Sequence, residues 1–314
     1  MNTNPRLSIV STLYRSEDAI EEFVQRSAEA AKHLVGTEFE IVLVDDGSPD
    51  NSVEIVRRLT SDYPQVVLVE LSRNFGHHPA LLEGLRQSRG DLVFLIDSDL
   101  EEEPEWLPVF AAYMEDTASD VIYGYQATRK GGLFERASGA VYWKTFRYLS
   151  GLDIPANIIT CRLMTRAYVD TVLQYQEREV SIGGIFSLAG FHQTPLSVDK
   201  GNKGKSSYST KLKVWHLVNS VTSFSTKPLE IIFVIGLIFT LIGFGLVAYL
   251  LIAAVAWNQP PVGWTSVMAS LWLIGGVVIL SLGTVSIYLG KVFLEVKARP
   301  RVVTQSVHPM DRRN

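Results

Sequence analysis

The sequence predicts an α/β protein made of a doubly wound, mostly parallel sheet followed by a two-helix transmembrane hairpin. Over residues 7–125, short β-branched segments alternate with helical segments of about 10 to 18 residues, which is typical of a parallel sheet covered on both faces. Later, residues 231–257 and 262–290 carry no charged side chain. Each of these stretches exceeds the roughly 20 residues that cross a bilayer.

The first part of the chain is expected to hold five strands with helices between them. The strand segments are apolar and β-branched, which favours burial within a parallel sheet. The expected strands are Leu7–Leu13, Glu38–Val44, Val66–Leu71, Leu92–Ile96 and Asp120–Tyr125. The expected helices run from Ser16 or Asp18 to about Leu34, from Ser48 to about Tyr63, from about Pro79 to Ser88 and from Glu105 to about Asp116.

The fourth strand ends in a dense group of acids. Asp97, Asp99, Glu101, Glu102 and Glu103 lie within seven residues. In an open α/β sheet, ligands bind beyond the carboxyl ends of the strands, and two carboxylates one residue apart can share a hard divalent cation that binds phosphate oxygens. The alternative is a solvated acidic loop before a helix.

Two other features support a phosphate site at this edge of the sheet. The second strand also ends in acids, Asp45 and Asp46, and Arg73 follows the third strand as a candidate direct partner for phosphate. The sequence has neither G-x-G-x-x-G after the first strand nor the P-loop pattern G-x-x-x-x-G-K-[ST]. Phosphates are therefore expected to be met through a metal.

Charges flanking the two apolar stretches predict the membrane orientation. Residues 258–261, Asn-Gln-Pro-Pro, form an uncharged turn, and the basic residues lie at the other ends of the stretches: Lys227, Lys291, Lys297, Arg299 and Arg301. The positive-inside rule then places both chain ends and the sheet domain in the cytoplasm. The alternative is a pair of buried helices in a soluble bundle.

Three basic segments lie between the sheet and the hairpin. Residues 131–150 and 211–224 are basic and aromatic, which suits either ordinary core helices or helices at a membrane surface. Residues 199–209 form a Gly-rich loop with three lysines, either a plain surface loop or one that closes on an anionic ligand. The expected divisions are a domain at 1–209, a juxtamembrane helix at 210–227, the hairpin at 228–291 (helices about 231–257 and 264–290) and a cytoplasmic tail at 292–314.

Composition excludes two classes of protein. The net charge of −4 and pI of about 5.9 leave no basic footprint for nucleic acid. The single cysteine, Cys161, excludes an internal disulfide framework and fits a reducing compartment.

The motifs together resemble the family 2 glycosyltransferases with a GT-A fold. More narrowly, they are similar to polyprenyl-phosphate glycosyltransferases of the dolichyl-phosphate mannose synthase and bacterial undecaprenyl-phosphate glucosyltransferase types. The resemblance covers roughly residues 7–303. The motifs that carry it are V-D-D-G-S-x-D (44–50), S-R-N-F-G-H-H (72–78), G-D-L-V-F-L-I-D-S-D-L (90–100), C-R-L-M-T-R (161–166), G-K-S-S-Y-S (204–209) and Y-L-G-K-V-F-L-E-V-K-A-R-P-R (288–301).

The resemblance implies roles for individual residues. Nucleotide-binding residues would be Thr12, Tyr14, Glu17, Asp45, Asp46, Arg73 and Asp97. The metal, Mg²⁺ or Mn²⁺, would be held by Asp99 and Asp97 with Glu101 as a third carboxylate. The acceptor phosphate or leaving diphosphate would face Arg129, Arg162, Lys203, Lys205, Ser206 and Tyr208, and the catalytic group would comprise Asp97, Asp99, Arg129 and Arg162.

The chain also departs from the family pattern. Glu101 stands where the family usually has Gln, Gln126 where it often has Arg, and Thr160 where many relatives have Asp. The first-strand Pro-x-Tyr-Asn pattern is Thr12-Leu13-Tyr14-Arg15 here. These positions bear on metal choice, on phosphate contacts and on the identity of the donor sugar.

The expected function is inverting transfer of one sugar from a nucleotide-diphosphate sugar to polyprenyl phosphate, at the cytoplasmic face of the inner membrane, for cell-envelope glycosylation. A homo-oligomer is a further expected partner, because some relatives are tetramers. One alternative is a processive polysaccharide synthase, but the Q-x-x-R-W motif of those enzymes is absent. Another is a non-catalytic membrane relative, which Glu101 and Gln126 alone favour.

Overall fold

The computed structural model describes residues 5–126, 148–149, 157–176, 182–199, 221–222, 225–257 and 263–309. The chain divides into two compact units, which we call the sheet unit and the helical unit. The sheet unit contains residues 1–140, 153–207 and 299–314, and the helical unit contains residues 141–152 and 208–298. The predicted basic helices at 131–150 and 211–224 lie almost entirely outside the described residues, as does most of the loop at 199–209.

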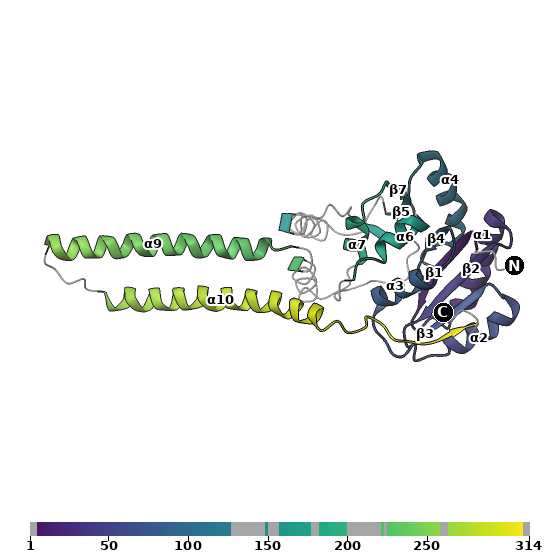
Figure 1. Cartoon of the computed structure of the whole chain (residues 1–314), viewed down its shortest axis with the longest axis horizontal. Helices are drawn as coiled ribbons and strands as arrows, with labels where there is room; N and C mark the ends of the chain where they lie inside the picture. The colour runs from purple at the N-terminus through teal and green to yellow at the C-terminus, as the bar shows by residue number, and fades with distance from the viewer. Residues whose placement is uncertain are drawn as a thin grey trace. The chain divides into compact units, whose positions relative to one another are not determined.

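The sheet unit is built on a single mixed sheet in the order β7-β5-β6-β4-β1-β2-β3-β8 (Figure 1). Pairing is parallel from β4 through β1 and β2 to β3, and between β5 and β7. Of the described strands, β6 and β8 run against the rest. The strands are β1 Leu7–Leu13, β2 Phe39–Asp45, β3 Val66–Leu71, β4 Leu92–Leu95, β5 Val121–Tyr125, β6 Ile158–Thr165, β7 Gln193–Ser197 and β8 Thr304–His308.

All five predicted strands are confirmed, and the sheet is mostly parallel as expected. Sequence patterning missed β6, β7 and β8. The strand β6 lies between β4 and β5 and is antiparallel to both, so the predicted fourth and fifth strands are not neighbours. The C-R-L-M-T-R motif forms most of this central strand.

Helices cover both faces of the sheet, which confirms the doubly wound prediction. One buried apolar cluster joins the sheet to α1, α2 and α4, and a second joins its other face to α3, α6 and α7. The alternation of strand side chains explains this division, since Ile9 and Ile41 belong to the first cluster and Val10 and Val42 to the second. The helices are α1 Ile20–Val35, α2 Ser52–Asp62, α3 His77–Gln87, the 3-10 turn η1 Pro104–Trp106, α4 Leu107–Thr117, α6 Arg166–Val172 and α7 Ile182–Leu188.

Two predicted helix starts were wrong. The helix α1 begins at Ile20 without a side-chain cap, so neither Ser16 nor Asp18 caps it. The helix α2 begins at Ser52, because the carboxylate of Asp50 accepts from the backbone N–H of Ser52 and residues 47–51 remain a loop. This loop lies at the carboxyl ends of the strands.

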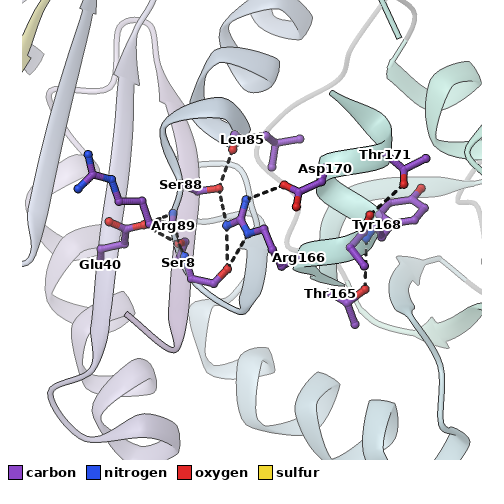
Figure 2. Close-up of polar contacts among 12 residues, drawn as sticks. Ser8, Glu40, Leu85, Ser88, Arg89, Thr165, Arg166, Tyr168, Asp170 and Thr171 are labelled. Carbon is purple, nitrogen blue, oxygen red and sulfur yellow. Dashed lines mark hydrogen bonds and ion pairs between the residues drawn. The ribbon is translucent and has the colours of Figure 1, made fainter. Parts of the chain in front are cut away.

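A polar network closes the opposite edge of the sheet, at the amino ends of β1, β2 and β4 (Figure 2). The hydroxyl of Ser8 donates to Glu40 (2.6 Å) and accepts from the N–H of Gly90 (2.7 Å). Arg166 donates to the carbonyl of Gly90 through Nε and Nη2 (2.9 and 2.7 Å) and to Ser88. Because these buried groups satisfy one another, they fix the turn that leads into β4.

The residues after the hairpin return to the sheet unit as an edge strand. The strand β8 pairs antiparallel with β3 and places Val307 in the second apolar cluster. Glu70 of β3 accepts from the hydroxyl of Ser306 (3.0 Å) and lies 3.2 Å from Nε2 of His308, while Arg57 donates to both of its oxygens at 2.9 Å. The strand β8 thereby covers the edge of β3, which would otherwise offer unpaired backbone groups to another strand.

The helical unit is dominated by two long helices, α9 Lys227–Trp257 and α10 Trp264–Val296, which contact each other (Figure 1). The hydroxyl of Tyr288, near the end of α10, donates to the carbonyl of Ser225 just before α9, so the two helices run antiparallel as a hairpin. Among the described residues, Leu273–Val296 is long and apolar enough to cross a membrane, and none of it is buried within the protein. The predicted helical hairpin is therefore present, with one candidate span by length and composition.

Candidate active site

The candidate site lies at the carboxyl ends of β1, β2 and β4, where the loops after the parallel strands meet. Thr12 is near the end of β1, Asp45 ends β2, and Asp97 follows β4 by two residues. The sheet order places β1 between β2 and β4, so these three side chains come from adjacent strands. This is the edge at which α/β sheets bind ligands.

The two acids after β2 hold the neighbouring loops. Asp45 accepts from the N–H groups of Gly47 and Ser48 (both 3.1 Å), and Asp46 accepts from those of Phe75 and Gly76 (2.6 and 2.9 Å). Burial raises the pKa of Asp46, and the hydrogen bonds from the two backbone N–H groups act in the opposite direction. Asp46 therefore joins the loop after β2 to the loop after β3, and Asp45 holds the start of its own loop.

His77 brings together the ends of β1 and β4. Its Nδ1 lies 3.0 Å from the hydroxyl of Thr12, and its Nε2 lies 3.6 Å from Oδ1 of Asp97. It is the first residue of α3 and its side chain is about half exposed (47%), whereas that of Asp97 is 21% exposed. His77 belongs to the S-R-N-F-G-H-H motif, but no role was predicted for it.

The acidic loop after β4 has an ordered internal structure. Asp99 accepts from the N–H of Glu101 (2.9 Å), and Leu100 between them has a left-handed backbone (φ 61°). Ser98 donates from its hydroxyl to the carbonyl of Thr12 (2.8 Å), which ties the loop to β1. Glu102 is completely buried and accepts from the N–H groups of Asp97 and Thr160. The alternative of a merely solvated acidic loop is therefore wrong for Glu102.

Three other predicted nucleotide-binding residues lie on the rim of the site. Glu17 accepts from both the backbone and the side-chain nitrogen of Asn51 (3.1 Å each), so it braces the loop after β2. Tyr14 is 48% exposed at the end of β1. Arg73 is exposed, and its guanidinium stacks 4.0 Å above the ring of Phe75.

Arg162 is buried in β6. Its guanidinium lies 3.8 Å from the ring centroid of Phe186, and Nε donates to the carbonyl of Thr160 (3.3 Å). Burial lowers the pKa of its guanidinium, and the nearby Tyr168, Cys161 and Glu102 act in the opposite direction. The remaining predicted phosphate-binding residues, Arg129, Lys203, Lys205, Ser206 and Tyr208, lie outside the described residues.

The donors after β4 suit a divalent cation in part. No three His, Cys, Asp or Glu side chains converge among the described residues. However, Mg²⁺ is commonly held by one or two carboxylates together with substrate phosphates and water. Asp97 and Asp99 supply such a pair at the mouth of the site, and the three-carboxylate set with Glu101 stays a prediction.

The chain belongs to glycosyl transferase family 2, whose family model matches residues 8–173, more than half of the chain. That segment contains every described residue of the candidate site. The resemblance to a glycosyltransferase is thereby confirmed.

Relatives match this chain over nearly its whole length. A protein of Mycobacterium tuberculosis described as a glycosyltransferase is 42% identical, over 98% of this chain and 89% of its own. The bactoprenol glucosyl transferase of Shigella phage SfX is 31% identical, over 96% of this chain and 99% of its own. The SfII prophage-derived bactoprenol glucosyl transferase of Shigella flexneri is 30% identical, over 96% and 98%.

Proposed function

We propose that this glycosyltransferase transfers a single sugar from a nucleotide-diphosphate sugar to polyprenyl phosphate at the cytoplasmic face of the inner membrane. The observation that carries the proposal is similarity, over 96% of this chain, to proteins named bactoprenol glucosyl transferase. The similar region includes the apolar hairpin as well as the sheet unit. A lipid acceptor explains why a catalytic domain would be followed by an exposed apolar helix such as Leu273–Val296.

The residues at the carboxyl ends of the strands would bind different parts of the donor. Thr12, Tyr14 and Glu17 on the rim would receive the base and ribose, with the loops that Asp45 and Asp46 hold. Asp97 and Asp99 would hold a divalent cation, Mg²⁺ or Mn²⁺, which when bound neutralises the leaving diphosphate. Arg73, Arg129, Arg162 and the lysines of the 199–209 loop would supply positive charge to phosphate groups.

The acceptor needs little help from a general base. A phosphomonoester has a second pKa near ~6 and is largely dianionic at neutral pH. Its oxygen attacks the anomeric carbon, the bond from that carbon to the diphosphate oxygen breaks, and the electron pair leaves with the nucleoside diphosphate. This direct displacement inverts the anomeric centre. The protein contributes by positioning donor and acceptor for that attack.

The proposed topology follows from the two apolar helices and their flanking charges. Both α9 and α10 cross the membrane, with Lys227 and the basic residues after Tyr288 on the cytoplasmic side. At about 1.5 Å per residue, 31 and 33 residues are each long enough to span the roughly 30 Å hydrocarbon core.

The test uses membranes that contain the full-length protein, polyprenyl phosphate and a panel of labelled nucleotide sugars. The wild-type protein should form a labelled lipid phosphate sugar from one member of the panel, and Asp99→Ala should abolish that product while staying in the membrane fraction. Asp116→Ala, an exposed aspartate at the end of α4, is the matched control and should be active. Wild-type turnover undiminished in excess chelator would refute the metal part, and elongating polymer in place of a single transfer would favour the processive synthase.

A further inference from the structure

Glu102 is a buried carboxylate within the otherwise accessible acidic loop. It is 0% exposed, whereas Glu103 beside it is exposed. A carboxylate away from water is costly unless hydrogen-bond donors compensate it. Its donors therefore indicate what it does.

Two of its donors are backbone N–H groups, one from Asp97, just after β4, and one from Thr160 of β6. Oε2 of Glu102 accepts from the N–H of Asp97 (3.3 Å), and Oε1 accepts from the N–H of Thr160 (3.1 Å). The strands β4 and β6 are antiparallel and pair from Leu92 with Thr165 to Leu95 with Arg162. Two steps further in this register, Asp97 would face Thr160. The carboxylate of Glu102 thus accepts from the two N–H groups that lie two register steps beyond the last pair of β4 and β6.

This arrangement links the acidic loop to the buried guanidinium of Arg162. The N–H of Thr160 is held by Glu102, and the carbonyl of Thr160 accepts from Nε of Arg162 (3.3 Å). Thr160 therefore connects Glu102 with Arg162 through its backbone N–H and its carbonyl, and the same carboxylate accepts from the backbone N–H of Asp97.

We propose that Glu102 is a positioning residue that sets the direction of the Asp97 carboxylate for metal and diphosphate binding. This inference rests on the proposed function. Glu102 contacts neither substrate nor metal; it acts through the backbone of Asp97 and through the Thr160 peptide. Its effect is therefore on affinity for the metal–nucleotide pair.

The geometry requires a carboxylate of this length. Both oxygens accept, so Gln would turn an NH₂ donor toward one of the two N–H groups and leave it without an acceptor. Asp keeps both acceptors but is one methylene shorter. Affinity for the metal–nucleotide pair should therefore be highest with Glu at position 102, lower with Asp and lowest with Gln.

The experiment measures binding of Mn²⁺, by electron paramagnetic resonance, to the purified full-length protein with UDP and with GDP as probes. The variants are Glu102→Gln, Glu102→Asp and the control Glu103→Gln, which removes the same charge one residue away. Loss of one hydrogen bond to a charged group corresponds to roughly tenfold weaker binding for Glu102→Gln, with Glu102→Asp in between and Glu103→Gln unchanged. Binding of the nucleotide without Mn²⁺ should not change.

The outcomes separate positioning from folding and from the proposed function. A folding defect reduces the number of sites and leaves the dissociation constant of those that remain, whereas misplacement of Asp97 raises the constant. If Glu102→Gln does not fold, Glu102→Asp carries the comparison with Glu103→Gln. Wild-type constants in both Glu102 variants would overturn the inference. If instead wild type and Asp99→Ala bind Mn²⁺ and either nucleotide equally, the proposed function is what fails.

Discussion

Gly47 lies where the loop after β2 passes against the loop after β3, and Gly47→Ala should break that contact. The backbone of Gly47 is left-handed (φ 68°), which costs a residue with a Cβ roughly 1–2 kcal/mol. An added Cβ would also lie 2.6 Å from the backbone nitrogen of Asn74 and 2.8 Å from the carbonyl carbon of Arg73. Backbone atoms cannot rotate away, and overpacking of this kind costs about 1–3 kcal/mol.

The expected loss of unfolding free energy in Gly47→Ala is about 2–5 kcal/mol, and a second glycine helps to separate its conformational and packing parts. Gly36 has a similar φ (65°), but an added Cβ there meets nothing within 4 Å. Its backbone (φ 65°, ψ −122°) is also one that glycine favours, so Gly36→Ala should lose only a conformational part. The difference between the two variants measures the contact between the loops.

Thermal unfolding of the sheet unit in the detergent-solubilised protein, followed by circular dichroism, is a suitable measurement. At about 2–4 °C per kcal/mol for a domain of this size, Gly47→Ala should unfold at least about 2 °C below Gly36→Ala. Sugar transfer should fall in Gly47→Ala alone, because the added Cβ displaces the loop after β3 and moves the N–H groups of Phe75 and Gly76 away from Asp46. Equal unfolding temperatures in the two variants would refute the proposed close approach.

Two further predictions concern the edges of the sheet unit. Arg26 of α1 donates to both oxygens of Glu105 (2.8 and 2.7 Å) and lowers the pKa of that carboxyl, so the pair stabilises the fold above the usual carboxyl value of 4.5 and this stabilisation is lost as pH falls below it. A double-mutant cycle with Arg26→Met and Glu105→Gln should give a coupling energy of no more than about 1 kcal/mol at pH 7, because both side chains are partly exposed. A coupling energy that persists at pH 3 would contradict this. Val307→Asp should increase amide hydrogen exchange in β3, since it buries a charge in the second apolar cluster, whereas the same change at the exposed Val303 should leave exchange in β3 as in wild type.

Sequence patterning predicted the parallel half of the sheet well because each of those strands is buried on both faces. Val66–Leu71 and Leu92–Leu95 are therefore continuous or nearly continuous apolar runs, which mark strands directly. Two of the three missed strands lack this signal. The strand β7, Gln-Thr-Pro-Leu-Ser, and β8, Thr-Gln-Ser-Val-His, are short edge strands rich in polar residues, and their assignment depends on tertiary pairing.

The start of α2 was predicted less well, because an acid organises the loop before it. Ser48-Pro49 has the composition of a helix start, but Asp45 accepts from the N–H of Ser48 within the loop, and the helix begins only at Ser52. The competing acceptor is three residues earlier in the chain. A local helix rule does not account for a carboxylate that turns back on its own loop.

The structure brings the acids that were predicted for the site to one edge of the sheet, but the sequence did not indicate which of them hold the loops. The sequence offers seven carboxylates at the ends of β2 and β4: Asp45, Asp46, Asp97, Asp99, Glu101, Glu102 and Glu103. Three of these, Asp45, Asp46 and Glu102, are buried and accept from backbone N–H groups, Asp45 within its own loop, Asp46 from the loop after β3 and Glu102 from β6. Local sequence cannot distinguish them, since the groups that they contact can be as far away as Thr160.

The acids after β2 and β4 differ in how many backbone N–H groups they accept from. A carboxylate that accepts two backbone N–H groups is already committed to holding the loop, so it has little capacity left for a cation. Glu102 and Asp46 each hold two such groups, whereas Asp97 and Asp99 stand in the more accessible part of the same edge. In the proposed assignment, Asp97 and Asp99 serve the ligand and Glu102 holds the backbone of Asp97. Replacing Glu102 should therefore weaken metal binding even though it is not proposed as a ligand.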